Sequence, residues 1–91
     1  MRIGRLGALL AMLLTSVALA AVDVNHASQA DLESVKGIGP ALSSVILSER
    51  RKGEFRSWAD FMARVGGVGD ASARRFSKAG LTVNGESYDK P

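Results

Sequence analysis

The stretch VKGIGP at residues 35–40 returns thirty positions later as VGGVGD at residues 65–70. Each copy places a Gly-x-Gly turn between two short amphipathic segments. A glycine turn that enters a helix leaves backbone N–H groups unpaired at the positive end of the helix dipole. Such a helix end attracts anions, and phosphate in particular, so the repeat predicts two phosphate-binding positions.

The first copy joins two expected helices. Ser28 and Asp31 have the spacing of a capping box, which predicts a helix over residues 29–35. Pro40 has no N–H to leave unpaired and suits the start of a second helix, expected over Pro40–Lys52 and ended by Gly53. The apolar face of this second helix is expected to consist of Ala41, Leu42, Val45 and Ile46.

The second copy repeats this arrangement. Ser57 and Asp60 form a second expected capping box before a helix over residues 58–65, and a fourth helix is expected over Asp70–Lys78, before Gly80. One helix pair cannot bury both of its faces, so the two copies should pack around a shared core with approximate two-fold symmetry. The residues expected inside that core include Ile38, Val68, Trp58, Phe61, Met62, Ala73 and Phe76.

The first twenty residues have the features of an export signal. Arg2 and Arg5 precede an uncharged apolar run, and small residues lead up to Ala20, after which we expect cleavage. The alternative is an uncleaved segment that anchors the chain to the inner membrane, because the uncharged stretch is only slightly shorter than the ~20 residues of a spanning helix. After cleavage, no stable membrane insertion is expected.

Composition indicates a small domain that is held together by packing alone. The chain has 91 residues and no cysteine, so disulfides cannot compensate for a small core. Without Arg2 and Arg5, its 12 basic residues fall to 10 against 9 acidic ones. The basic residues gather in the repeat region, a distribution that suits an anionic partner but is also common on solvated helices.

The residues give little support for catalysis. The carboxylates of the repeat region are explained as helix starts, and no nucleophile with a paired base is visible. His26 is the only histidine and has no cysteine beside it, so neither a metal site nor another cofactor is expected. We therefore expect binding without chemistry.

The order and spacing of these residues resemble the double helix-hairpin-helix domain of the ComEA family of competence proteins. The likeness begins at residues 22–28, continues through 32–40, and includes 53–57, 60–61 and 65–69. It implies an all-α tandem helix-hairpin-helix domain of about four short helices over residues 21–84, after a signal peptide over 1–20 and before a flexible tail over 85–91.

The resemblance also implies a function. Members of this family bind double-stranded DNA outside the cytoplasmic membrane and help to draw it inward during natural transformation. A periplasmic protein is thus expected that binds the phosphate backbone from the minor-groove side, without reading sequence. Its expected protein partners are an outer-membrane uptake pore or an inner-membrane DNA channel.

Carried over residue by residue, the resemblance assigns phosphate contacts to the backbone of both turns. These are Gly37, Ile38 and Gly39 in the first turn and Gly67, Val68 and Gly69 in the second. Lys36 and Arg74 would add positive charge nearby. Ser43 and Ser44 lie where a hydroxyl can reach a phosphate, although serine is equally ordinary on a helix surface.

Asp70 departs from the family pattern, because it follows the second turn with a negative charge. It either caps the fourth helix or occupies the amide site itself, in which case the second turn binds phosphate poorly. Asp70, Leu42 and the near-neutral mature charge favour an alternative function. In that alternative the chain is an exported protein–protein interaction module of a secretion or envelope complex.

Overall fold

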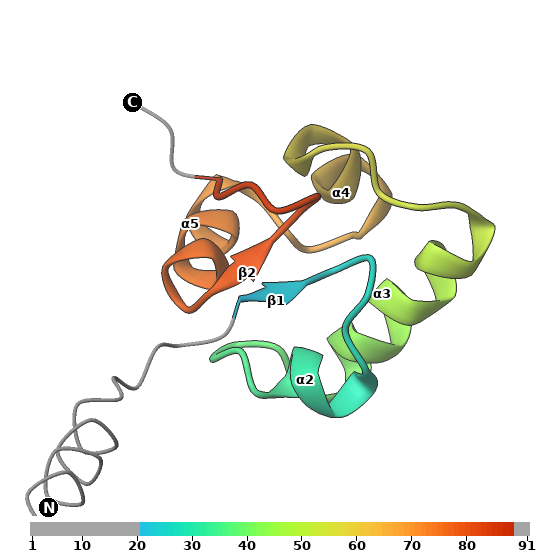
Figure 1. The fold of residues 1–91 in the computed structure, drawn as a ribbon, viewed down its shortest axis with the longest axis horizontal. Coiled ribbons are helices and arrows are strands. Elements are labelled where there is room, and N and C mark those ends of the chain that lie inside the picture. Colours follow the sequence, from blue (N-terminus) through green and yellow to red (C-terminus); the bar gives the residue numbers. More distant parts are fainter. Residues whose placement is uncertain (1–20, 89–91) are drawn as a thin grey trace, which may run out of the picture.

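Helices dominate the part of the chain that this computed structural model describes, residues 21–88 (Figure 1). The elements follow in the order β1 (Val22–Asp23), α2 (Gln29–Glu33), α3 (Pro40–Lys52), α4 (Trp58–Arg64), α5 (Asp70–Lys78) and β2 (Leu81–Thr82). The expected signal peptide lies outside the described residues. Within residues 21–88, no helix has the length and apolar character needed to cross a membrane.

The first helix starts as expected but ends early. Ser28 Oγ accepts the Asp31 N–H at 3.0 Å, and the Asp31 carboxylate accepts the Ser28 N–H at 3.4 Å, which completes the predicted capping box. Helix α2 ends at Glu33 rather than at Val35. After Glu33 the backbone forms tighter turns: the Val35 N–H donates to the Leu32 carbonyl at 3.0 Å, and the Val35 carbonyl accepts the Ile38 N–H at 2.9 Å.

The start of α4 confirms only half of the second capping box. Ser57 Oγ accepts the Asp60 N–H at 3.0 Å, as predicted. The Asp60 carboxylate accepts the Arg56 N–H at 3.0 Å, not that of Ser57. Helix α4 then ends at Arg64, one residue before the predicted end.

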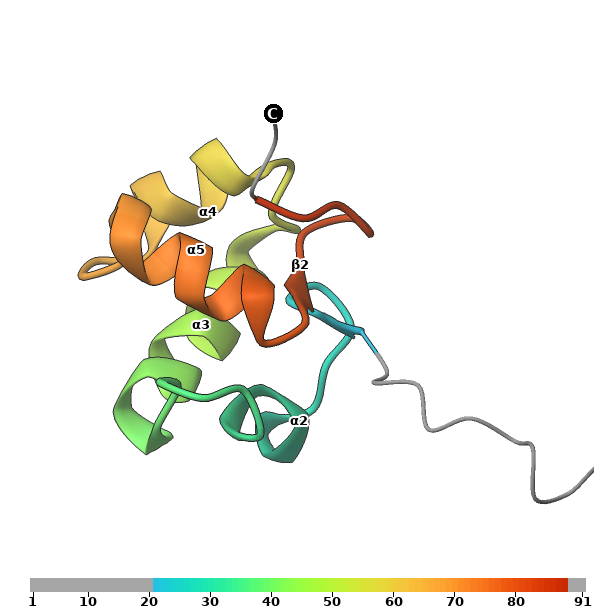
Figure 2. The ribbon, with the colours of Figure 1, turned by 90° about the vertical axis from the view of Figure 1, so that its left-hand side faces the viewer.

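The two copies of the repeat have nearly the same conformation. Buried, half-buried and exposed positions follow the same order over residues 35–50 and 65–80. Ile38 and Val68 occupy equivalent core positions, at 3% and 5% exposure, which confirms their predicted role. Both Gly-x-Gly turns lie on the left of Figure 2, at the starts of α3 and α5. The predicted helical fold with two pseudo-symmetric halves is therefore confirmed.

The core-facing side of α3 differs from the prediction. Ile46 is buried and Leu42 is half-buried, but Ala41 is exposed and Val45 is 43% exposed. Ser43 takes the buried position that Ala73 has in α5, because the core-facing stripe runs through positions 43 and 46 as it runs through 73 and 76. Val45 therefore points out of the core.

A short parallel strand pair joins the two ends of the domain. Val22 pairs with Leu81, and Asp23 pairs with Thr82. No sequence pattern predicts this pairing, because each strand has only two residues. The Asp23 carboxylate accepts hydrogen bonds from the Thr82 hydroxyl at 2.7 Å and from the Gly85 N–H at 2.8 Å. Burial alone would raise the pKa of Asp23, but the hydrogen bonds from Gly85 and Thr82 outweigh it and hold the pKa below its usual value.

Residues 85–88 belong to the fold and do not form the expected tail. Val83 and Glu86 form a β-bridge, and the Trp58 indole N–H donates to the Glu86 carbonyl at 2.8 Å. The Tyr88 N–H donates to Ser77 Oγ at 2.9 Å. These contacts fasten the C-terminal segment to α4 and α5, whereas residues 89–91 of the expected tail lie outside the described residues.

Candidate nucleic-acid interface

Gly37 is the residue that the first turn requires. Its φ of +100° is a conformation that side chains with a Cβ rarely adopt. A Cβ added there would also lie 2.9 Å from the edge of the Phe76 ring on α5. The first turn is thus held against the helix of the other repeat, and glycine at this position is explained by the fold itself.

The fold gives no such reason for Gly39. Its φ of −100° is open to any residue, and no heavy atom lies within 4 Å of the position of a Cβ. Gly39 is the N-cap of α3, where Ser, Thr, Asp or Asn usually satisfies a free N–H, yet no side chain caps this helix. The first N–H groups of α3 are therefore open to a ligand, and the missing side chain lets a phosphate approach them.

Two residues predicted to contact phosphate at the first turn do not have the required group available. The Ile38 N–H closes the turn by donating to the Val35 carbonyl. Ser43 is fully buried, and its hydroxyl donates to the Glu33 carboxylate at 2.6 Å. This hydrogen bond holds the pKa of Glu33 below its usual value and joins α2 to α3, so Ser43 is structural. Ser44 is exposed and stays a candidate.

Three cations line one hollow beside the first turn. Lys36 and Gly37 line a hollow of about 440 Å³ together with Arg75, Lys78 and Ala79 of the other repeat. Among the ion pairs of the described residues, none involves Lys36, Arg75 or Lys78. Their charges are therefore not neutralised by an ion pair among the described residues, and they favour an anion at the hollow beside Gly37.

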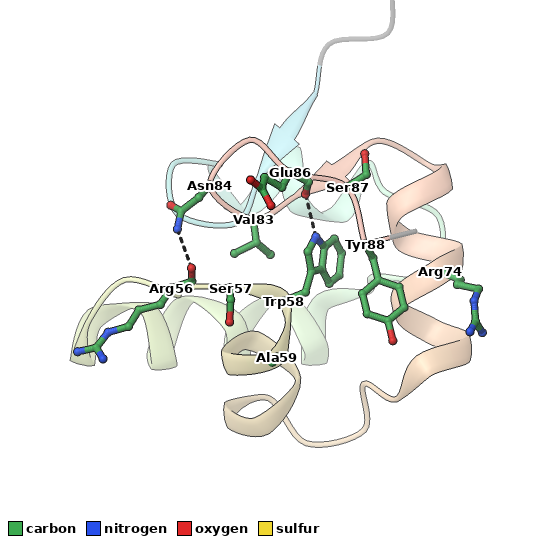
Figure 3. A pocket seen from close by; sticks show the side chains of 10 residues that line it. All are labelled: Arg56, Ser57, Trp58, Ala59, Arg74, Val83, Asn84, Glu86, Ser87 and Tyr88. Carbon is green, nitrogen blue, oxygen red and sulfur yellow. Dashed lines mark hydrogen bonds between the residues drawn. The ribbon is translucent and has the colours of Figure 1, made fainter. Parts of the chain in front are cut away.

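The sequence prediction did not include Arg75 and Lys78; it named Lys36 and Arg74 as the cations near the two turns. The repeat itself could have indicated these two residues, because two-fold packing of the copies brings the exposed face of α5 beside the first turn. Arg74 lies elsewhere on α5: its guanidinium carbon is 6.0 Å from the centre of the Tyr88 ring (Figure 3). It lines a separate hollow between α4, α5 and the C-terminal segment.

The second turn has the same backbone but fewer charges. Gly67 has a φ of +89°, and the N-cap Gly69 has a φ of −105° with open space where a Cβ would lie. Gly66 stands at the position of Lys36. At the positions of Arg75 and Lys78, helix α3 has the uncharged residues Val45 and Ser48. Val68 points its side chain into the core.

Asp70 neither caps α5 nor occupies the second amide site. The N-cap of α5 is Gly69, and no side chain accepts a hydrogen bond there. The Asp70 carboxylate instead accepts a hydrogen bond from the Tyr88 hydroxyl. The start of α5 is therefore open, although a negative charge lies beside it.

Two glycine turns of the same conformation, each entering an uncapped helix, are the arrangement that the repeat predicted. A family model described as a helix-hairpin-helix motif matches residues 17–78. The chain belongs to this family. Helix-hairpin-helix membership is compatible with nucleic-acid binding through the two open helix ends. No curated protein and no solved structure matches the chain.

Proposed function

We propose that this helix-hairpin-helix protein binds double-stranded DNA independently of sequence and assists DNA uptake in natural transformation, without catalysis of its own. Family membership and the two uncapped helix ends support nucleic-acid binding. The ComEA-like order of motifs behind an apolar N-terminal segment supports the more specific role. The protein would act in the periplasm, either free after signal cleavage or anchored to the inner membrane.

The observation that carries this proposal is the first hairpin. A phosphate above the start of α3 would accept hydrogen bonds from the free N–H groups that Gly39 leaves accessible. Lys36, Arg75 and Lys78 would neutralise its charge and that of the adjoining phosphates. These groups recognise the backbone and not base edges, so duplexes of different sequence should bind equally.

The second hairpin would contact a phosphate on the opposite side of the minor groove. Its turn lies on the same side of the domain as the first turn (Figure 2). In the uptake process, protein bound behind the entry pore would hinder backward sliding of the DNA. This directional role needs no nucleotide cofactor, and an outer-membrane pore or an inner-membrane channel would be the protein partner.

A salt series tests the proposal. Binding of unrelated duplexes of equal length should be equal and should weaken roughly a hundredfold between about 50 and 200 mM salt, if about four phosphates are neutralised. Single strands of the same length serve as the comparison and should bind more weakly. Absence of duplex binding at low salt, or a strong preference for one sequence, would contradict the proposal.

A protein-interaction module is the second candidate, and one observation favours it. Val45 is the exposed large hydrophobic residue among those described, and it occupies the position that Arg75 has in the other repeat. An apolar, uncharged surface there suits a protein partner more than DNA. If duplex binding is absent, loss of a protein partner on Val45→Asp would support this second function.

A further inference from the structure

We propose that Tyr88 is a positioning residue for the second hairpin. Its hydroxyl would hold the Asp70 carboxylate away from the first N–H groups of α5 and so keep this helix end open to phosphate. The inference rests on the proposed DNA-binding function and assigns a role to the C-terminal segment within it.

Asp70 is placed where a carboxylate would otherwise compete with the ligand. It is the first residue of α5 and directly follows the N-cap Gly69. A carboxylate in the first turn is stabilised by the positive end of the helix dipole and readily accepts hydrogen bonds from free N–H groups. In this chain, the hydrogen bond from Tyr88 takes up one oxygen of that carboxylate, and no side chain caps α5.

Tyr88 is itself held in position from two helices. Its ring packs on Trp58 of α4, with 5.3 Å between ring centres and an angle of 59° between the planes (Figure 3). Its N–H donates to Ser77 Oγ of α5 at 2.9 Å. The indole of Trp58 holds the same segment through the Glu86 carbonyl at 2.8 Å. The hydroxyl is therefore presented to Asp70 by a fixed ring and not by a loose tail.

The first hairpin needs no hydroxyl to hold a carboxylate away from its helix. Pro40 stands at the position of Asp70, so the first residue of α3 carries no carboxylate. The Tyr88 hydroxyl thus binds a carboxylate at a position where only the second repeat has one. This difference gives the C-terminal segment a role in binding that its distance from the turns in sequence does not suggest.

The test compares Tyr88→Phe with the same change made in an Asp70→Asn background. The phenylalanine keeps the ring contact with Trp58 but removes the hydroxyl. In the wild-type background we expect duplex affinity at low salt to fall about threefold, because the freed carboxylate then lies at the helix end. In the Asp70→Asn background, where no anion can compete, the same change should leave affinity unchanged.

Two measurements without DNA separate a positioning role from a structural one. Thermal unfolding should show that Tyr88→Phe leaves the domain folded at the assay temperature. The amide proton shifts of Ala71 and Ser72 should move on Tyr88→Phe, as the carboxylate approaches, but should not move when Asp70 is already Asn. Unmoved amides, or an equal loss of affinity in both backgrounds, would overturn the inference. If these amides respond but no variant binds duplex, the positioning contact stands and the proposed DNA-binding function fails.

Discussion

The two hairpins share one backbone conformation and differ in the charges around it. Gly37 and Gly67 have φ of +100° and +89°, and Gly39 and Gly69 both begin an uncapped helix. The first turn has three cations beside it, two of them from the other repeat, whereas Asp70 follows the second turn. The glycine pattern thus determines the shape of a hairpin, and the helix packed against it determines its charge.

The two turns also differ in how closely the rest of the domain packs against them. A Cβ at Gly37 would meet the Phe76 ring at 2.9 Å, while a Cβ at Gly67 would meet nothing within 4 Å. The residue at the position of Phe76 in the first repeat is Ile46, which is smaller. The first turn is therefore in closer contact with the rest of the domain than the second turn is, and more positive charge lies beside it. We infer that it would provide most of the affinity in the proposed binding of DNA.

The largest effect should come from reversing all three cations of the first hairpin. We expect the combined change of Lys36, Arg75 and Lys78 to Glu to weaken duplex binding by more than about a hundredfold and to lower the salt slope by roughly 3. A matched control reverses Arg51, Lys52 and Arg56, which carry the same charge but do not line the hollow beside Gly37. Titration at several salt concentrations measures both variants, and equal losses would contradict this comparison.

A carboxylate placed at each N-cap in turn should show how much each hairpin contributes to duplex affinity. Gly39→Asp meets no steric obstacle and should stabilise α3 by a few tenths of a kcal/mol, because the new side chain caps the helix. The same carboxylate would occupy the phosphate position, so duplex affinity should fall about tenfold. Gly69→Asp should lower duplex affinity by less than Gly39→Asp does. Thermal unfolding and duplex titration of both variants check the prediction, which fails if the change at 69 costs more.

A smaller effect is expected from giving the second turn the cation it lacks. Gly66 stands at the position of Lys36, does not have a positive φ, and has open space where a Cβ would lie. Gly66→Lys should raise duplex affinity several-fold at low salt and increase the salt slope by about 0.9 if it meets a phosphate. Gly66→Gln is the uncharged control. No change in the salt slope would show that the second turn does not contact the DNA.

The smallest effect on DNA binding is expected at the strand pair, which lies apart from the residues of the hairpin comparison. Asp23→Asn weakens the hydrogen bonds to Thr82 and Gly85, so the domain should be less stable at neutral pH while duplex affinity stays unchanged. The pKa of Asp23 is lowered in the fold, so its contribution to stability is present above the usual pKa of 3.8 and is lost as the pH falls below it. Unfolding measured between neutral pH and about pH 3 should therefore be less pH-dependent in the variant than in wild type.

Local sequence signals predicted the helices and turns because each depends on neighbouring residues. Pro40, the glycines of the turns and the Ser28 cap act within a few positions, and α3 and α5 have the predicted ends. The strand pair was not predictable in the same way. A two-residue strand has no periodicity, and its partner lies almost sixty positions away along the chain.

The site was predicted less completely, for the same physical reason. Arg75 and Lys78 reach the first turn only through the packing of one repeat on the other. Ser43 looked like a surface hydroxyl, but the register of α3 turns it toward Glu33. Tyr88 looked like part of a tail, although an aromatic ring that can pack on Trp58 gives such a segment a reason to fold back.

The most direct test of the first hairpin's leading role follows the backbone amides of both turns while a short duplex is added. We predict that the amide signals of Gly37, Gly39 and Ala41 move at the lowest DNA concentrations, and that raised salt removes their shifts last. Those of Gly67 and Gly69 should follow at higher concentrations. Shifts that begin at the second turn, or that leave both turns unmoved while the duplex is bound, would contradict the account.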